Sequence, residues 1–147
     1  MRPNRRIGIR IAGVAAAFLA IPLASCGTRK TPTEPLEPVD PTATFSRVQA
    51  EIFTSSCALS GCHAGPTPQQ GMDLSAGRSY ASIVGVTATE STRFRIAPGD
   101  PTGSYLVSKT AGDATIAGSR MPLGGPYLDA TTQKLLVDWV RRGAPND

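Results

Sequence analysis

Two of the three cysteines in this chain and its only histidine lie within seven positions, in the stretch CALSGCH at residues 57–63. The histidine directly follows the second cysteine. A chain of 147 residues that contains so few of these residue types has few other side chains able to hold a metal ion or a cofactor. Any fold of this chain must bring Cys57, Cys62 and His63 to one place, and the chemistry of that place is the main clue to function.

Three kinds of chemistry can use two thiols and an imidazole at this spacing. Cys57 and Cys62 could form a disulfide, which closes a short loop and needs no histidine. A structural zinc ion takes four ligands, but the chain has no second histidine and only one further cysteine. Covalent attachment of haem is the third, since both thiols bond to the porphyrin and the adjacent histidine ligates the iron. Haem attachment requires His63 to follow Cys62, so haem c is the expected cofactor.

The spacing of the two cysteines departs from the usual attachment motif. Haem c is commonly bound at C-x-x-C-H, whereas this chain has C-x-x-x-x-C-H. A loop that contains Ser60 and Gly61 can bulge to absorb the additional residues, because glycine adopts positive φ without strain. Haem attachment therefore stays the leading interpretation, with a Cys57–Cys62 disulfide as its main rival.

A low-spin haem iron also needs a ligand on the face opposite the histidine. Met121 lies in the glycine-rich segment IAGSRMPLGGPYL, and such a loop can carry a thioether to the distal face while Pro122 stiffens it. Met72 follows the attachment motif closely, and packing is the role expected for it. Met121 is therefore the expected distal ligand, and His63 the proximal one.

Residues 1–25 are typical of a secretory signal, with a basic start, an apolar run and small residues before Cys26. The ending LASCG resembles the lipobox of bacterial lipoproteins, in which the cysteine after the cleavage site is acylated. This resemblance implies that Cys26 is a lipid anchor and that Gly27 directs the protein to the outer membrane. We therefore expect an exported protein, lipid-anchored at the periplasmic face of the cell envelope.

Residues 26–43 are rich in proline and poor in apolar side chains, so we expect a tether there. Four of the 15 Lys and Arg residues lie in the signal, which contains no acid, and the remaining 11 balance the 11 Asp and Glu residues. A neutral mature chain gives no electrostatic support to a nucleic-acid partner. The expected membrane contact is the anchor at Cys26.

Residues 44–147 are enough for one small domain. Apolar side chains at helical spacing predict a first helix that begins near Phe45 and runs into Cys57. Either a capping box of Ser46 and Gln49 or the preceding Asp-Pro pair could start this helix.

Three further helices are predicted in the domain. The first covers residues 75–84 with Ser75 as its cap, and the next follows Asp100-Pro101. The last begins at Asp129, buries one apolar face and stops at Gly143. Strand signals are weak, so the expected fold class is mainly α, with long Gly/Pro-rich loops.

The order of these segments resembles small monohaem c-type cytochrome domains of bacterial envelope lipoproteins. The resemblance covers nearly all of residues 44–147, and its most specific parts are the haem motif and the segment RMPLGG. It implies a cytochrome c-like helical domain around one haem, with His63 proximal, Met121 distal and the first and last helices packed together.

Two further roles concern the surroundings of the haem. Pro66 resembles the proline of related cytochromes whose carbonyl orients the proximal histidine, although Pro68 competes for this role. Arg93, Arg95 and Arg120 could pair with the haem propionates, and Arg120 is preferred because it adjoins the expected distal methionine.

One-electron transfer is the function that this interpretation predicts. An iron ligated on both faces has no open site for a substrate, so an electron carrier is expected rather than an enzyme. Its partners would be other redox proteins of the envelope. The alternatives are a haem-free structural lipoprotein with a Cys57–Cys62 disulfide, and a haem enzyme or sensor with an open sixth position.

Overall fold

The computed structural model describes residues 37–147. Internal contacts divide the chain after residue 35, and the second unit, Leu36–Asp147, contains every described residue. The expected signal peptide, the expected anchor at Cys26 and most of the expected tether lie outside the described residues.

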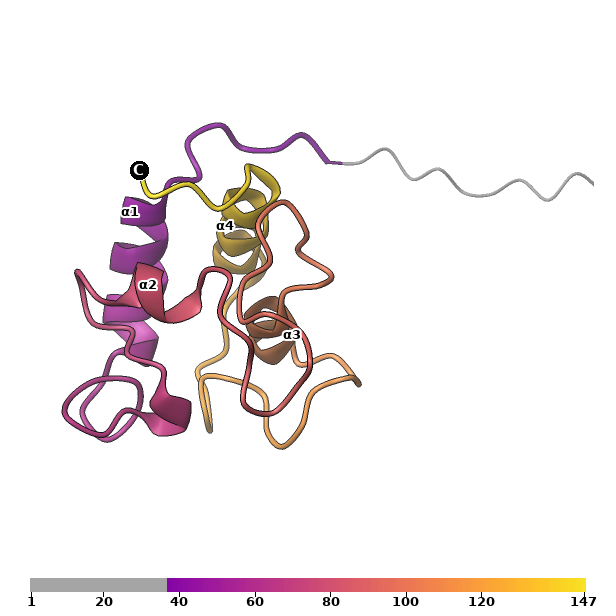
Figure 1. The fold of residues 1–147 in the computed structure, drawn as a ribbon. Coiled ribbons are helices and arrows are strands. Elements are labelled where there is room, and N and C mark those ends of the chain that lie inside the picture. Colours follow the sequence, from indigo (N-terminus) through magenta and orange to yellow (C-terminus); the bar gives the residue numbers. More distant parts are fainter. Residues whose placement is uncertain (1–36) are drawn as a thin grey trace, which may run out of the picture. The chain divides into compact units, whose positions relative to one another are not determined.

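Helices are the regular elements of the described residues, which form no extended strand. In chain order (Figure 1) they are α1 Phe45–Val48, its π-helical continuation η1 Gln49–Cys57, the 3-10 turn η2 Gln69–Gly71, α2 Ser79–Ile83, α3 Tyr105–Ala111 and α4 Ala130–Arg141. The mainly α fold class is confirmed, while the cytochrome c-like arrangement stays a prediction. Within residues 37–147 no helix is long and apolar enough to cross a membrane.

α1 and η1 form one continuous helix that ends at Cys57, as the apolar spacing predicts. Thr44 caps its start, because the Thr44 side chain accepts a hydrogen bond from the Arg47 amide. η1 is wound more widely than an α-helix, and the Ala58 amide closes it by donating to the carbonyl of Phe53 at 2.7 Å. The buried side chains of this helix are Val48, Ile52, Phe53 and Cys57.

Neither of the two starts considered for the first helix is used, because Thr44 caps it rather than Ser46 or the Asp40-Pro41 pair, and the cap expected at Ser75 is wrong as well. The Ser46 hydroxyl donates instead to the backbone carbonyl of Asp147 at 2.8 Å. α2 begins at Ser79 rather than at Ser75, and no side chain caps it. Spacing along the chain identifies only local partners, whereas the C-terminus provides a distant acceptor that Ser46 uses.

α4 has the start, the buried face and the stop that its sequence predicts. The Asp129 carboxylate caps it by accepting a hydrogen bond from the Thr132 amide at 2.7 Å. The helix ends before Gly143, whose φ of 94° suits glycine. Its buried face consists of Leu135, Leu136, Asp138, Trp139 and Val140.

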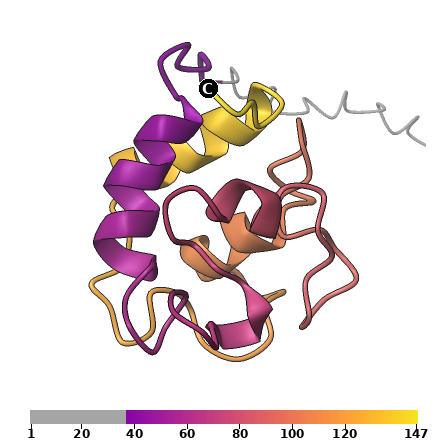
Figure 2. The ribbon, with the colours of Figure 1, turned by 60° about the vertical axis from the view of Figure 1, so that its left-hand side comes forward.

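The first helix and α4 pack across each other at one end of the domain (Figure 2). Phe45 contacts both Tyr80 and Trp139, with ring centroids 5.1 and 5.5 Å apart. Trp139 is fully buried, and its indole N–H donates to the carbonyl of Pro145 at 2.9 Å. The C-terminal residues thus close this end of the domain, while η1 runs away from it.

α3 packs against α4. Tyr105 and Leu106 are buried. The hydroxyl of Ser104, just before the helix, donates to the carbonyl of Asp100 and accepts from the Ala97 amide, both at 2.8 Å. These bonds hold the Asp-Pro turn against the start of α3, so the helix is fixed at its N-terminal end.

Asp129→Ala removes the cap of α4 and should lower the free energy of unfolding by about 1 kcal/mol. Thr131→Ala, at an exposed position in the same first turn, is the matched control and should change it by less than about 0.5 kcal/mol. Chemical denaturation followed by circular dichroism measures both values. Equal stabilities of the two variants would show that the Asp129 carboxylate does not stabilise the helix.

Candidate functional site

A cavity of about 560 Å³ lies between the end of η1, the η2 turn, α3 and the loop before α4. This volume is in the range of about 300 to 1000 Å³ that is typical of sites for small molecules and cofactors. Cys57, Cys62, His63 and Met121 all line the cavity. The four side chains singled out in the sequence therefore meet in one space. Apolar wall residues include Leu59, Met72, Leu74, Leu106 and Leu123.

The two thiols are placed by the end of η1 and by the turn that follows it. Cys57 is the last residue of η1 and is buried, whereas Cys62 is exposed, and both thiols are free. The Cys62 amide donates to the carbonyl of Leu59 at 3.0 Å, and the His63 amide donates to that of Cys57 at 3.2 Å. Gly61, with φ of 81°, provides the left-handed residue of this turn. The longer spacing is thus accommodated by a compact turn between the thiols.

His63 is half-buried in the cavity wall, and its Nδ1 atom lies 3.2 Å from the backbone carbonyl of Gln69. If that carbonyl accepts the Nδ1 proton, Nε2 is the nitrogen left for a metal ion. Burial lowers the pKa of His63, and the charges of Arg95 and Lys109 act in the same direction, while the backbone carbonyls of Gln69 and Met72 oppose them. Burial therefore favours the neutral imidazole, the form that binds a metal.

The sequence favoured Pro66 for this role, with Pro68 as the competing residue, and did not identify Gln69. The chain doubles back after the attachment motif, because the Gln69 amide donates to the carbonyl of Cys62 at 2.8 Å and the Leu74 amide to that of His63 at 2.7 Å. This loop returns the Gln69 carbonyl to the imidazole. No side-chain signal could have identified it, because the acting group belongs to the backbone.

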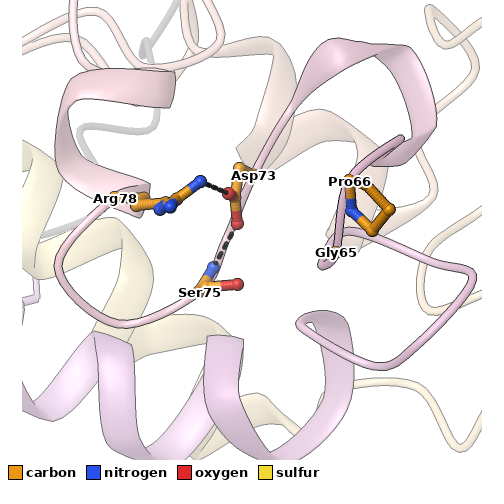
Figure 3. Close-up of a pocket in the computed structure, with 5 residues that line it drawn as sticks. All are labelled: Gly65, Pro66, Asp73, Ser75 and Arg78. Atoms are coloured by element: carbon orange, nitrogen blue, oxygen red, sulfur yellow. Dashed lines mark hydrogen bonds and ion pairs between the residues drawn. The ribbon is translucent and has the colours of Figure 1, made fainter.

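Pro66 lies beside a separate surface hollow and not in the large cavity. Figure 3 shows it with Gly65, across from Asp73, Ser75 and Arg78. There the Asp73 carboxylate accepts from the Ser75 amide at 2.9 Å and forms an ion pair with Arg78 at 3.5 Å. These bonds hold the surface around the hollow, and none of them contacts the histidine.

Both methionines of the described residues line the cavity, but they come from different parts of the fold. Met72 is buried in the core, and its amide donates to the carbonyl of Gln69 at 3.1 Å, so it belongs to the loop that supports His63. Met121 is half-buried in the loop before α4, where its amide donates to the carbonyl of Lys109 at 2.9 Å. Of the two, only Met121 reaches the cavity from an element that does not carry the histidine.

Two buried cations, Arg95 and Lys109, line the cavity, with 8% and 7% of each residue exposed. Lys109 has a counterion, because the Glu90 carboxylate lies 3.1 Å from its ammonium group. Arg95 forms no ion pair with any described residue, and its guanidinium donates to backbone carbonyls. A buried cation without a counterion favours an anionic group in the cavity.

Arg120, the arginine preferred from the sequence as the partner of the haem propionates, does not line the cavity. Its Nε donates to the carbonyl of Thr110 at 2.8 Å, and its guanidinium carbon lies 4.3 Å from the ring centroid of Tyr127. Arg93 is also engaged outside the cavity wall. Among the three arginines considered from the sequence, Arg95 alone lines the cavity.

Comparisons with protein families, with curated protein sequences and with solved structures found no match to this chain. In the part of the chain that the structure describes, no group of three or more His, Cys, Asp and Glu side chains is placed to hold a metal ion. The chemistry of the site therefore has to be inferred from the geometry of its own residues.

The two cysteines should differ in reactivity in the folded chain whenever their thiols are free. Burial, with a smaller contribution from nearby Cys62, raises the pKa of Cys57 to about 11, so very little thiolate forms at neutral pH. Timed alkylation with iodoacetamide, followed by peptide mass spectrometry, should label Cys62 at least about tenfold faster. Urea should abolish the difference, and equal rates in the folded chain would contradict the burial of Cys57.

Proposed function

We propose that this protein is a one-electron carrier of the bacterial cell envelope with one haem c attached through Cys57 and Cys62. The observation that carries the proposal is the shared cavity, which is lined by two free thiols, an imidazole and a thioether. Covalent haem attachment uses two thiols, which form thioether bonds to the ring, and an adjacent histidine that ligates the iron, while a methionine thioether can be the second iron ligand. The resemblance of the sequence to monohaem c-type cytochromes supports the same function.

The size, polarity and charge of the cavity fit a haem. A volume of about 560 Å³ with leucine and methionine side chains in the walls suits a flat and largely apolar ring. The uncompensated guanidinium of Arg95 suits the propionate groups, which are the acidic substituents of haem. The residues present therefore match the expected group in shape as well as in chemistry.

His63 and Met121 would hold the iron in this proposal. The Gln69 carbonyl would orient the imidazole and make Nε2 more basic by accepting the Nδ1 proton. Met121 comes from the loop before α4 and reaches the cavity independently of His63, whereas Met72 belongs to the loop of Gln69.

Bound haem iron supplies reversible one-electron chemistry, and a thioether ligand favours its ferrous state. With His63 and Met121 both bound to the iron, no position would be left for a substrate, and this would favour electron transfer over catalysis. Apolar side chains in the cavity wall would lower the polarity around a bound haem, and this would also favour the ferrous state because it disfavours extra positive charge.

Electron partners would meet the domain where the cavity opens to solvent. Cys62 is exposed and lines the cavity, as does Leu123, which is 72% exposed. A small apolar contact of this kind suits brief encounters with other redox proteins of the envelope. The lipid anchor at Cys26, outside the described residues, would hold the domain at the periplasmic face of the outer membrane, and no nucleic-acid partner is proposed.

A haem enzyme or sensor with an open sixth position is the second candidate. One observation favours it, because the Glu90 carboxylate lines the cavity close to Lys109 and the hydroxyl of Tyr105. Such a group could move a proton at a substrate on the iron. Binding of carbon monoxide to the reduced protein without displacement of a ligand would support this candidate over the electron carrier.

Protein produced in a host with cytochrome c maturation machinery should keep its haem on a denaturing gel and give the pyridine haemochrome spectrum of haem c. Replacing Cys57 and Cys62 by serine should remove the covalent haem, and His63→Ala should abolish the low-spin spectrum. Mass spectrometry that finds both wild-type thiols unmodified, or joined in a disulfide, would exclude the proposed function.

Met121→Leu should leave the haem attached but remove the sulfur-to-iron charge-transfer absorption of the oxidised protein, because it removes the distal ligand. Met72→Leu is the matched control on the same cavity and should keep this band, at a stability cost below about 1.5 kcal/mol. The opposite pattern would assign the distal position to Met72. A band that survives both substitutions would exclude either methionine as the ligand.

A further inference from the structure

Hydrogen bonds of its backbone amide, its backbone carbonyl and its guanidinium hold Arg95 in the cavity wall. Its amide donates to the carbonyl of Val86 at 2.7 Å, and its carbonyl accepts from the Leu106 amide in α3 at 3.0 Å. One guanidinium nitrogen donates to the carbonyl of Ser82 at 2.8 Å. These contacts fix the buried guanidinium in place relative to α3 and the loop before it.

The same guanidinium binds the turn that supports the histidine. It donates to the carbonyl of Gln70 at 2.7 Å and to that of Gly71 at 3.5 Å. These two residues directly follow Gln69, whose carbonyl lies 3.2 Å from Nδ1 of His63. A planar fork of N–H donors can bind several carbonyls at once, and a lysine ammonium is a single point of charge that cannot reproduce this pattern.

The turn needs support because part of its backbone is unfavourable. Gln70 has φ of 56°, in the left-handed region that residues other than glycine rarely adopt. Its side chain is exposed and contacts the hydroxyl of Thr89 at 2.7 Å. The hydrogen bond between the Gln70 carbonyl and buried Arg95 is partly buried, so it is better protected from competition by water than the exposed contact with Thr89.

Stability alone does not account for an arginine at this place. Arg95 is a buried cation with no ion-pair partner among the described residues, and burial lowers its pKa. Removing a charge from water is costly, and an apolar side chain of similar volume would pack without that penalty. The position of the guanidinium, between the cavity and the turn of Gln69, indicates a role in the site.

We propose that Arg95 is a positioning residue for His63. By holding the turn of residues 69–71, it keeps the Gln69 carbonyl on the Nδ1 proton and so makes Nε2 a stronger donor to the iron. A more basic imidazole stabilises ferric iron, so this hydrogen bond lowers the reduction potential. The inference rests on the proposed function, but the hydrogen bond itself involves only groups of this chain.

The test uses the fact that His63 is the only histidine, so labelling with 15N-histidine gives the signals of one ring. In the reduced, haem-loaded mature protein the Nδ1 proton should exchange slowly with solvent. Arg95→Lys keeps the positive charge but loses the planar set of N–H donors. It should accelerate this exchange at least about tenfold and raise the reduction potential. Arg93→Lys, the same change outside the cavity wall, should alter neither quantity.

A second substitution separates positioning from a general loss of structure. Gln70→Gly removes the backbone strain, because glycine adopts positive φ freely. The turn should therefore persist even when the side chain at position 95 binds its carbonyls less tightly. The double variant Gln70→Gly/Arg95→Lys should therefore recover slow exchange and the wild-type potential, and it should fold even if Arg95→Lys alone does not. Wild-type exchange and potential in Arg95→Lys, or a double variant without recovery, would overturn the inference.

Failure of the proposed function can be told apart from failure of this inference. If the wild-type protein carries no haem, the proposed function is wrong, and the 15N signals of the folded haem-free chain are then compared. Slow Nδ1 exchange that is lost in Arg95→Lys supports the positioning role. Equal exchange in the wild type and in Arg95→Lys contradicts it.

Discussion

The packing of the first helix against α4 is the contact on which the rest of this structure depends. The domain is poor in aromatic residues, and Phe45 and Trp139 join the two helices at the end where the start of the first helix meets the C-terminal Asp147. Once this end is closed, η1 can only run away from it. The helix therefore ends with Cys57 in the wall of the cavity, and the turn that follows brings Cys62 and His63 to the same wall.

The cavity is the part of the interior that these helices do not fill. A small domain has little apolar area to stabilise it, so a hollow of about 560 Å³ beside its core is costly unless another group occupies it. The proposed haem would complete the core while its iron performs the chemistry. In this view stability and function use the same apolar surfaces, among them those of Met72 and Leu74, which belong to both the core and the cavity wall.

Backbone groups make much of the contact with the two side chains His63 and Arg95. The carbonyl of Gln69 orients the imidazole, and the carbonyls of Gln70 and Gly71 bind the guanidinium of Arg95. A layer built from carbonyls tolerates changes of side chain, but it depends on the conformation of the turn. The proposed links from Arg95 to the turn and from the turn to His63 therefore connect a residue of the middle loops to the properties of the imidazole.

Local patterns in the sequence determined the helix that ends at Cys57, the cap, face and stop of α4, and the adjacency of Cys62 and His63, because each depends on residues a few positions apart. The tertiary structure alone decided which distant groups meet these elements. It placed the Gln69 carbonyl on the imidazole, Arg95 in the cavity wall and the C-terminus on Ser46. Those contacts depend on how loops fold back and which acceptors become buried, and neither periodicity nor spacing along the chain contains that information.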